Sequence, residues 1–441
     1  MTPGKHHQDN ILHTIQLVGA VVFGLALLHT FAAKSFEVLS RRHPRHAGLF
    51  HLLGEVEVVF GFWAFILIIA MALLDGPNDA IEYAETRHYT EPLFVFTVMV
   101  MAASRPVLDI VQRGLRTLAR LLPVRTELAL SWLGLALVPL TGSLITEPAA
   151  MTLAALMLAP LVFRDGIPEW LKYGALGVLF VNVSIGGTLT AYAAPPVLMV
   201  AATWQWDSLY MATRFGWKAA LAVAVNATVV CLLLRPHLRA LAERDTGGGH
   251  ATKAADGTGA AAPLPVPPAV TAIHLAFLAA VVLLGHHPVL FLGLFMLFLG
   301  FTTAYQRYQH PLIIKEGLLV GFFLAGLVVL GGMQQWWLQP IVESLSPVAL
   351  FFGALGLTAI TDNAALTYLG SLIVGISEQS QYMLMAGAVA GGGLTVIANA
   401  PNPAGAALLR RGFNDESIGA VGLLLGALGP TAVAAAAFLL L

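Results

Sequence analysis

TEPAAMT at residues 146–152 and TDNAALT at residues 361–367 are the two phrases that decide how this sequence folds. Each phrase places an acidic residue, Glu147 or Asp362, inside an apolar stretch that is long enough to lie within a membrane. A carboxylate at that depth costs about 2.5 to 3.5 kcal/mol on insertion scales, so it indicates a functional site. Two such residues in matching surroundings predict an ion or proton site.

The composition excludes an ordinary soluble domain. Of the 441 residues, 58% are hydrophobic and only 11% are charged, whereas a soluble domain carries about 25% charged residues. Many apolar runs of about 20 residues, separated by short polar loops, predict an all-α polytopic membrane protein. The sequence has no basic arm for nucleic acid. It also contains no nucleotide-binding loop, zinc motif or nucleophile elbow, so an enzyme is not expected.

Apolar runs outside the two phrases predict transmembrane helices at residues 11–33, 50–74, 91–104, 209–234, 269–285, 288–304, 313–332 and 418–441. Residues 105–125 alternate arginines with leucines, which is typical of an amphipathic helix on the cytoplasmic surface; a solvated loop is the alternative. The loop between the first two helices is basic, and the next loop is acidic. By the positive-inside rule, the N-terminus and the C-terminus then both lie outside.

Both phrases lie in helices that the sequence interrupts. Pro148 breaks the segment 127–163, because proline lacks an amide hydrogen and clashes with the preceding turn. Arginines at both ends of that segment predict a re-entrant hairpin from the cytoplasm, and residues 341–377 predict a second hairpin from outside. Residues 170–203 and 381–409 are predicted to cross once each, with breaks at the similar phrases GGTLT and GGGLT.

These elements divide the chain into two halves with the same plan. Residues 235–268 are rich in arginine, glycine, alanine and proline, which predicts a flexible cytoplasmic linker. The halves 1–234 and 269–441 each contain five transmembrane helices plus one re-entrant hairpin. Because five is odd, two similar units must have opposite orientations, so the fold is predicted to be an inverted repeat with broken helices at the membrane midplane.

Sodium is a hard cation, which prefers oxygen ligands, and oxygens gather at the predicted helix breaks. The predicted sodium and proton site consists of Asp362, Glu147, Asn363, Thr146, Thr361, Thr190, Thr395, Asn399, Asn402 and Ser184. Two structural alternatives stay open: the carboxylates could cap half-helices, and the hydroxyls could bond to their own helices. Glu55 and Glu57 are either a proton relay or interfacial helix charges. No cofactor is expected, since sodium and protons would be transported substrates.

Three stretches carry a resemblance to a known family. TGSLITEPAAMTLAAL, TAITDNAALTYLGSLI and GGGLTVIANAPNPAG resemble phrases of the bacterial sodium/proton antiporter family. That family belongs to the ion transporter superfamily, with D-type sodium/proton antiporters, arsenite permeases and divalent anion/sodium symporters. The resemblance covers essentially the whole chain. It implies a scaffold domain around a transport domain, a homodimer in the bacterial inner membrane, elevator-like motion, and contact with lipid and small cations.

The expected function is therefore secondary transport that exchanges sodium for protons. The alternative is a sodium- or proton-coupled anion transporter of the same superfamily. The related divalent anion symporters carry Ser-Asn-Thr phrases at their hairpin tips, whereas this chain has Thr-Glu-Pro and Thr-Asp-Asn. Acidic residues there would repel a dicarboxylate, which favours cation exchange.

Overall fold

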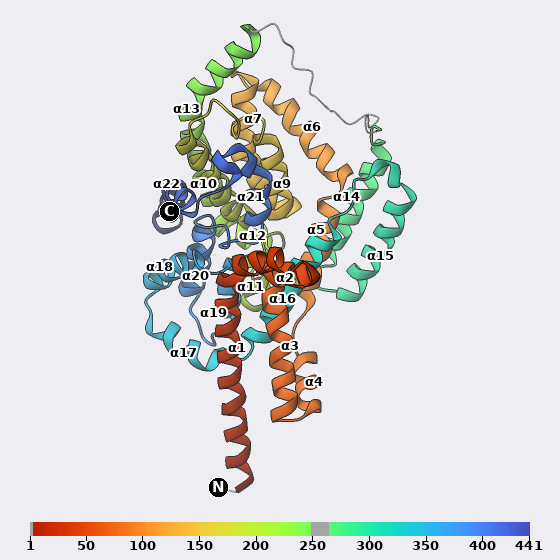
Figure 1. Ribbon diagram of the computed structural model, residues 1–441, viewed down its shortest axis with the longest axis vertical. Helices are drawn as coiled ribbons and strands as arrows, with labels where there is room; N and C mark the ends of the chain where they lie inside the picture. Colours follow the sequence, from red (N-terminus) through yellow and green to blue (C-terminus); the bar gives the residue numbers. More distant parts are fainter. Residues whose placement is uncertain (1–2, 248–263) are drawn as a thin grey trace.

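The computed structural model describes residues 3–247 and 264–441. Within these ranges every regular element is helical and there is no strand (Figure 1), which confirms the predicted all-helical membrane protein. In the part of the chain that the structure describes, five helices are long and apolar enough to cross a membrane, and up to seven if each of two bent helix pairs counts as one span. The pairs bend by 62° and 44°.

The first half begins with α1 (Pro3–Arg42), α2 (Ala47–Gly54), α3 (Val56–Leu74), α4 (Pro77–Glu85), α5 (Thr90–Ala102) and α6 (Arg105–Leu121). It continues with α7 (Thr126–Leu135), α8 (Leu137–Ile145), α9 (Glu147–Leu158), α10 (Glu169–Gly186), α11 (Pro195–Trp204), α12 (Ser208–Met211) and α13 (Trp217–Gly247). The predicted helix at 50–74 is divided, because Glu55 has an extended backbone between α2 and α3.

The second half consists of α14 (Pro268–Leu283), α15 (Pro288–Ala304), α16 (Ile314–Gly331), α17 (Gln335–Ser344), α18 (Pro347–Thr358), α19 (Asn363–Ser371), α20 (Glu378–Gly391), α21 (Asn402–Leu409) and α22 (Ala420–Leu440). Helices α3 and α16 pack closely across the two halves, because a Cβ added at Gly326 would collide with the backbone of Phe60 and Gly61, and one added at Gly61 would collide with the Phe322 ring. Short 3₁₀ and π turns join several of the helices.

Residues 105–121 form the predicted amphipathic helix rather than a loop. Leu115 and Ala119 of α6 are buried, whereas Arg113, Arg116 and Arg120 are exposed. Helix α6 follows α5 after a sharp bend and runs toward the end of the molecule where α7 begins (Figure 1).

The predicted flexible linker is wrong at its start. Helix α13 continues through residues 235–247, because Leu238 and Leu241 keep the helical spacing of apolar contacts. Leu238 is buried. Leu241 packs closely on Gly166, because a Cβ added at Gly166 would lie 2.7 Å from Leu241 Cδ2. Residues 248–263, which make up most of the rest of the predicted linker, lie outside the described residues.

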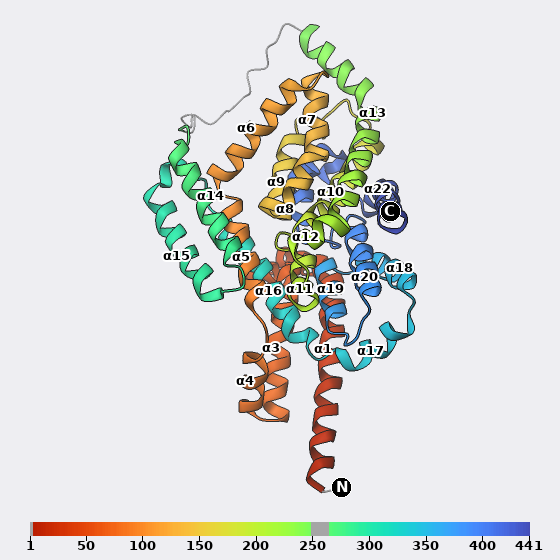
Figure 2. The ribbon, with the colours of Figure 1, turned by 180° about the vertical axis from the view of Figure 1, so that it is seen from behind.

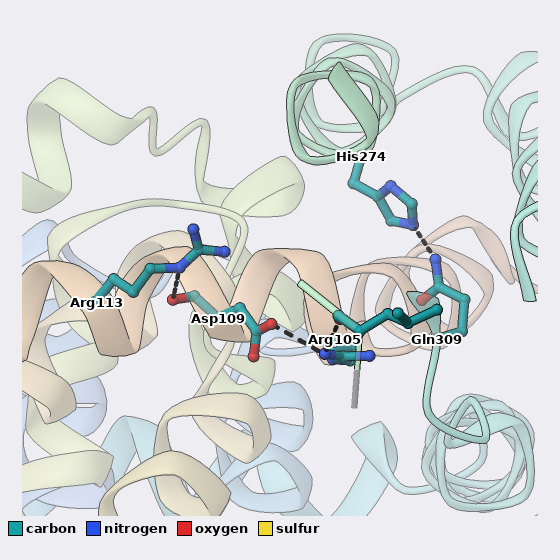
Figure 3. A network of polar contacts seen from close by, with 6 residues as sticks. Arg105, Asp109, Arg113, His274 and Gln309 are labelled. Carbon is teal, nitrogen blue, oxygen red and sulfur yellow. Dashed lines mark hydrogen bonds and ion pairs between the residues drawn. The ribbon is translucent and has the colours of Figure 1, made fainter. Parts of the chain in front are cut away.

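A polar network fastens the start of the second half to α6 (Figure 3). Arg105 Nη2 donates to the Leu264 carbonyl at 2.7 Å, and its Nε lies 3.4 Å from Asp109 Oδ2. Nearby, the Gln309 amide donates to His274 Nε2 at 2.8 Å. His274 Nδ1 therefore carries the hydrogen and donates to the Val270 carbonyl at 2.7 Å.

Candidate functional site

Glu147 lies at the break between α8 and α9. Thr146 precedes it with φ of 76°, a left-handed conformation that is uncommon for a residue with a side chain. This turn starts α9 at Glu147, whose side chain is 0% exposed. Glu147 Oε2 accepts a hydrogen bond of 2.9 Å from Asn399 Nδ2. The start of α9 therefore contacts the segment between α20 and α21.

Asp362 lies at the break between α18 and α19 and caps the second helix. Its Oδ1 accepts from the amides of Ala364 at 2.8 Å and Ala365 at 3.2 Å. The Asp362 side chain is half-buried, as is that of Thr361, whose amide closes the last turn of α18. At Asp362 the structure thus contains the cap that the sequence left open as an alternative.

Hydroxyls in the predicted broken crossings tie each one to the predicted hairpin of its own half. Thr190 Oγ1 donates to the Ser143 carbonyl at 2.6 Å, and Thr395 Oγ1 donates to the Ala359 carbonyl at 2.9 Å. Asn402 Nδ2 donates to the carbonyl of Thr395 at 2.9 Å and to that of Gly392 at 2.8 Å. These side chains hold the unwound backbone in place.

Other contacts join the halves to each other. Asn363 Nδ2 of α19 donates to Ser184 Oγ of α10 at 3.3 Å, and Ser184 Oγ donates to the Val389 carbonyl at 2.8 Å. Glu147 and Asp362 lie within electrostatic reach of each other. The structure therefore gathers the predicted site residues from all four broken elements around one buried region.

Buried oxygens without partners concentrate in this region, which holds five of the nine found among the described residues. Among the described residues, Thr146 Oγ1, Glu147 Oε1, Asn363 Oδ1, Asn399 Oδ1 and Asn402 Oδ1 have no hydrogen-bond partner. The amide nitrogens of the three asparagines are already engaged as donors. An unpaired buried polar group costs about 1 to 3 kcal/mol. Carboxylate, amide and hydroxyl oxygens are the ligand types of hard cations, so the arrangement is suited to bind one.

Aligning α9 with α19 by their helix starts gives a pairing of residues that is shifted by one from the alignment of the two sequence phrases. Thr146 and Asp362 are the N-caps of α9 and α19, so Glu147 corresponds to Asn363. Contacts with the matching phrases GGTLT and GGGLT agree. A Cβ at Gly187 would collide with Glu147 Oε1, and one at Gly392 would lie 3.0 Å from Asn363 Nδ2. The two acidic residues therefore occupy non-equivalent positions.

Two cavities flank the predicted broken crossings, with volumes of about 620 and 930 Å³. Six residues of the smaller cavity each have a counterpart in the larger one at the same sequence separation as Gly187 and Gly392. Those of the smaller cavity are Ala191, Tyr192, Leu198, Ala201, Ala202 and Gln205. Their counterparts, in the same order, are Val396, Ile397, Pro403, Ala406, Ala407 and Arg410. Each predicted broken crossing thus borders a cavity through residues at matching sequence positions.

The two acidic residues near the start of α3 have different surroundings. Glu55 lines the larger cavity, with Oε1 3.6 Å from His51 Nε2 and 3.9 Å from Lys315 Nζ. Glu57 lies within electrostatic reach of Asp362. One acid therefore borders the cavity and the other is coupled to the candidate site.

Sequence reasoning missed Ser143 as a member of the site. Ser143 Oγ donates to the Gly186 carbonyl at 2.7 Å and accepts from the Leu189 amide at 2.9 Å, which fixes the break of the first crossing. The available signal was its place in the phrase TGSLIT, three residues before Thr146.

A bundle of apolar helices with buried oxygens at its helix breaks defines a multi-pass membrane transporter. Comparison with protein families makes this specific. The chain belongs to the family described as "Putative Na+/H+ antiporter", whose profile matches residues 14–441. It is thus a transporter and not an enzyme. No curated protein matches the sequence.

Among solved structures, the YdaH transporter of Alcanivorax borkumensis is similar to this chain at 15% sequence identity and a TM-score of 0.39. The match covers 87% of this chain and 96% of that one.

Proposed function

We propose that this protein is a secondary transporter that exchanges sodium for protons across the bacterial inner membrane. The observation that carries the proposal is the group of buried, unpartnered oxygens around the Glu147 carboxylate. A sodium ion bound there would satisfy oxygens that otherwise cost free energy. The family to which the chain belongs supports the same choice of substrates.

Competition for one carboxylate supplies the chemistry of exchange. In a low-dielectric site, an unpaired carboxylate favours its protonated form, and a bound cation favours the ionised form. Glu147 therefore holds either a proton or sodium. The oxygens of Thr146, Asn363, Asn399 and Asn402 complete the sodium site, because each is buried and unpartnered among the described residues.

The remaining predicted site residues position the helix ends. Asp362 caps α19 and adds negative charge within reach of Glu147. Thr361, Ser184, Thr190 and Thr395 hold the breaks through the hydrogen bonds described above. Glu55 and Glu57 pass protons between the larger cavity and this region, since Glu55 borders that cavity and Glu57 is coupled to Asp362.

Alternating access follows from an inverted repeat of residues 1–234 and 269–441. The matched contacts of GGTLT and GGGLT and the matched lining of the two cavities support this repeat. Inversion places the smaller cavity on the external side and the larger on the cytoplasmic side. The hairpins and broken crossings interlock through Glu147, Asn399, Ser184 and Asn363, so they move as one transport unit in an elevator-like step.

The test uses the purified protein in liposomes that contain a pH-sensitive dye. With an imposed proton gradient, added sodium is expected to dissipate the gradient, and parallel additions of lithium and potassium measure cation selectivity. Sodium-dependent uptake of an anion such as a dicarboxylate, without proton movement, would contradict the proposal and favour anion transport.

A further inference from the structure

A pocket of about 390 Å³ lies where the turn between α6 and α7 meets α13, away from the candidate ion site. Figures 1 and 2 both show α7 beside α13, with the start of α7 at the end of α6. Trp132 Nε1 of α7 donates to Thr228 Oγ1 of α13 at 3.0 Å, which fixes the two helices side by side. The pocket therefore has walls on rigid elements.

Positive charge dominates this pocket. Arg125 approaches from the start of α7, and Arg235 and Arg239 approach from α13. The two α13 arginines are one turn apart and so lie on the same helix face. Glu127 is the acidic residue of the lining, so three guanidinium groups face one carboxylate. Guanidinium groups bind phosphate through paired, charge-assisted hydrogen bonds.

An apolar stripe on α13 leads away from the arginines. Leu221, Val225, Val229 and Leu232 recur at helical spacing and are between 40% and 59% exposed. The same face continues through Arg235 and Arg239. Leu232 itself lines the pocket, together with Val124 and Leu128. The surface of α13 thus changes from apolar to basic within one turn. A phospholipid shows a matching change, from apolar acyl chains to a charged headgroup.

We propose that this pocket binds an anionic phospholipid, with its phosphate among Arg125, Arg235 and Arg239 and an acyl chain along the α13 stripe. Free phosphate would match the charges but would leave the apolar stripe uncovered. By the positive-inside rule, the arginine-rich turn faces the cytoplasm. Basic pockets between transmembrane helices on that side are suited to anionic headgroups. The proposal is independent of which ions the protein exchanges.

Native mass spectrometry of the full chain in detergent tests this assignment. Phosphatidylglycerol and phosphatidylcholine with identical acyl chains are added in parallel. The wild type is expected to retain phosphatidylglycerol preferentially. In the double variant Arg235→Gln/Arg239→Gln, the dissociation constant of phosphatidylglycerol is expected to rise about fivefold for each arginine that is removed. The matched control, Arg113→Gln/Arg411→Gln, removes the same charge outside the pocket and is expected to retain the lipid.

Two further measurements separate the sources of the phosphate. Leu232→Ser keeps every charge but weakens the stripe, so it is expected to lower phosphatidylglycerol retention. Inorganic phosphate is expected not to displace the lipid from the wild type. Equal retention of both lipids by the wild type, equal loss in the two double variants, or displacement by inorganic phosphate would overturn the proposal. Circular dichroism checks that each variant is folded.

Discussion

At the scale of single residues, Glu147 and Asp362 are different in kind. Glu147 is fully buried, and one of its oxygens has no hydrogen-bond partner among the described residues. Asp362 is half-buried, and its Oδ1 is occupied by two backbone amides of α19. Glu147 is therefore available to a proton or cation, whereas Asp362 holds the start of a helix.

Gly187 offers a test of the carboxylate's position. A Cβ at this residue would collide with Glu147 Oε1 and lie 2.9 Å from Glu147 Cγ. We expect Gly187→Ala to displace the carboxylate, to abolish sodium-dependent proton movement and to destabilise the protein by about 1 to 3 kcal/mol, as overpacking does. Thermal unfolding in detergent measures the stability, and liposome assays measure the exchange.

The matched control for this variant is Gly174→Ala. Gly174 lies on α10 of the same crossing, and an added Cβ there would meet no heavy atom within 4 Å. We expect the control to keep exchange and stability. Exchange at the wild-type rate in Gly187→Ala would show that the carboxylate does not need its present position.

The residue types of the site could be predicted from sequence, but their pairing could not. Acidic and amide residues inside apolar stretches are costly and therefore conspicuous, as for Glu147 and Asn399. When the phrases TEPAAMT and TDNAALT are aligned in sequence, Glu147 matches Asp362. When α9 and α19 are aligned by their N-caps, Glu147 matches Asn363. This shift depends on the left-handed backbone of Thr146, which the sequence alone does not indicate.

At the scale of elements, proline and glycine explain which helix breaks could be predicted. Pro148 and the phrases GGTLT and GGGLT act locally, and the structure breaks the helices next to them. The break at Glu55 likewise follows a glycine, Gly54, whereas the extension of α13 has no such local signal. The extension depends on the burial of Leu238 and on the packing of Leu241 against Gly166, which lies far earlier in the chain. Contacts of this kind are not visible in local sequence.

The two cavities permit a test of the inverted repeat at the element scale. Ala202 of α11 and Ala407 of α21 are exposed, equivalent lining residues. The test replaces Ala202 or Ala407 with cysteine in a Cys231→Ala background, which removes the buried native thiol. A membrane-impermeant maleimide should label Ala202→Cys in right-side-out vesicles and Ala407→Cys in inside-out vesicles.

Cys231→Ala alone is the control and should remain unlabelled in both preparations. Labelling of both cysteines from the same side would contradict the inverted orientation of the halves.

At the scale of the whole molecule, charge and hydropathy were enough to predict the class of fold but not its spans one by one. The sequence predicts five crossings in each half, whereas five to seven helices in the described residues are long and apolar enough to cross a membrane. The predicted broken crossings are divided into short helices such as α11 and α21. Each of these is shorter than the length of about 20 residues that a helix needs to span a bilayer. Their assignment therefore depends on the packing of the pieces.

The molecule as a whole brings residues of both halves to one buried region. Asn399 follows Glu147 by more than half of the chain length, yet the two side chains are hydrogen-bonded at 2.9 Å. Neither half alone contains the group of unpartnered oxygens. The proposed cation exchange therefore requires both halves of the fold.

The most direct test of the proposed exchange through Glu147 compares the wild type, Glu147→Gln and Asp362→Ser in liposomes that report sodium-driven proton movement. We expect exchange by the wild type, none by Glu147→Gln, and retained exchange by Asp362→Ser, because serine also caps a helix. If the wild type exchanges and Glu147→Gln does so at the same rate, Glu147 does not carry the exchanged proton and the account is wrong.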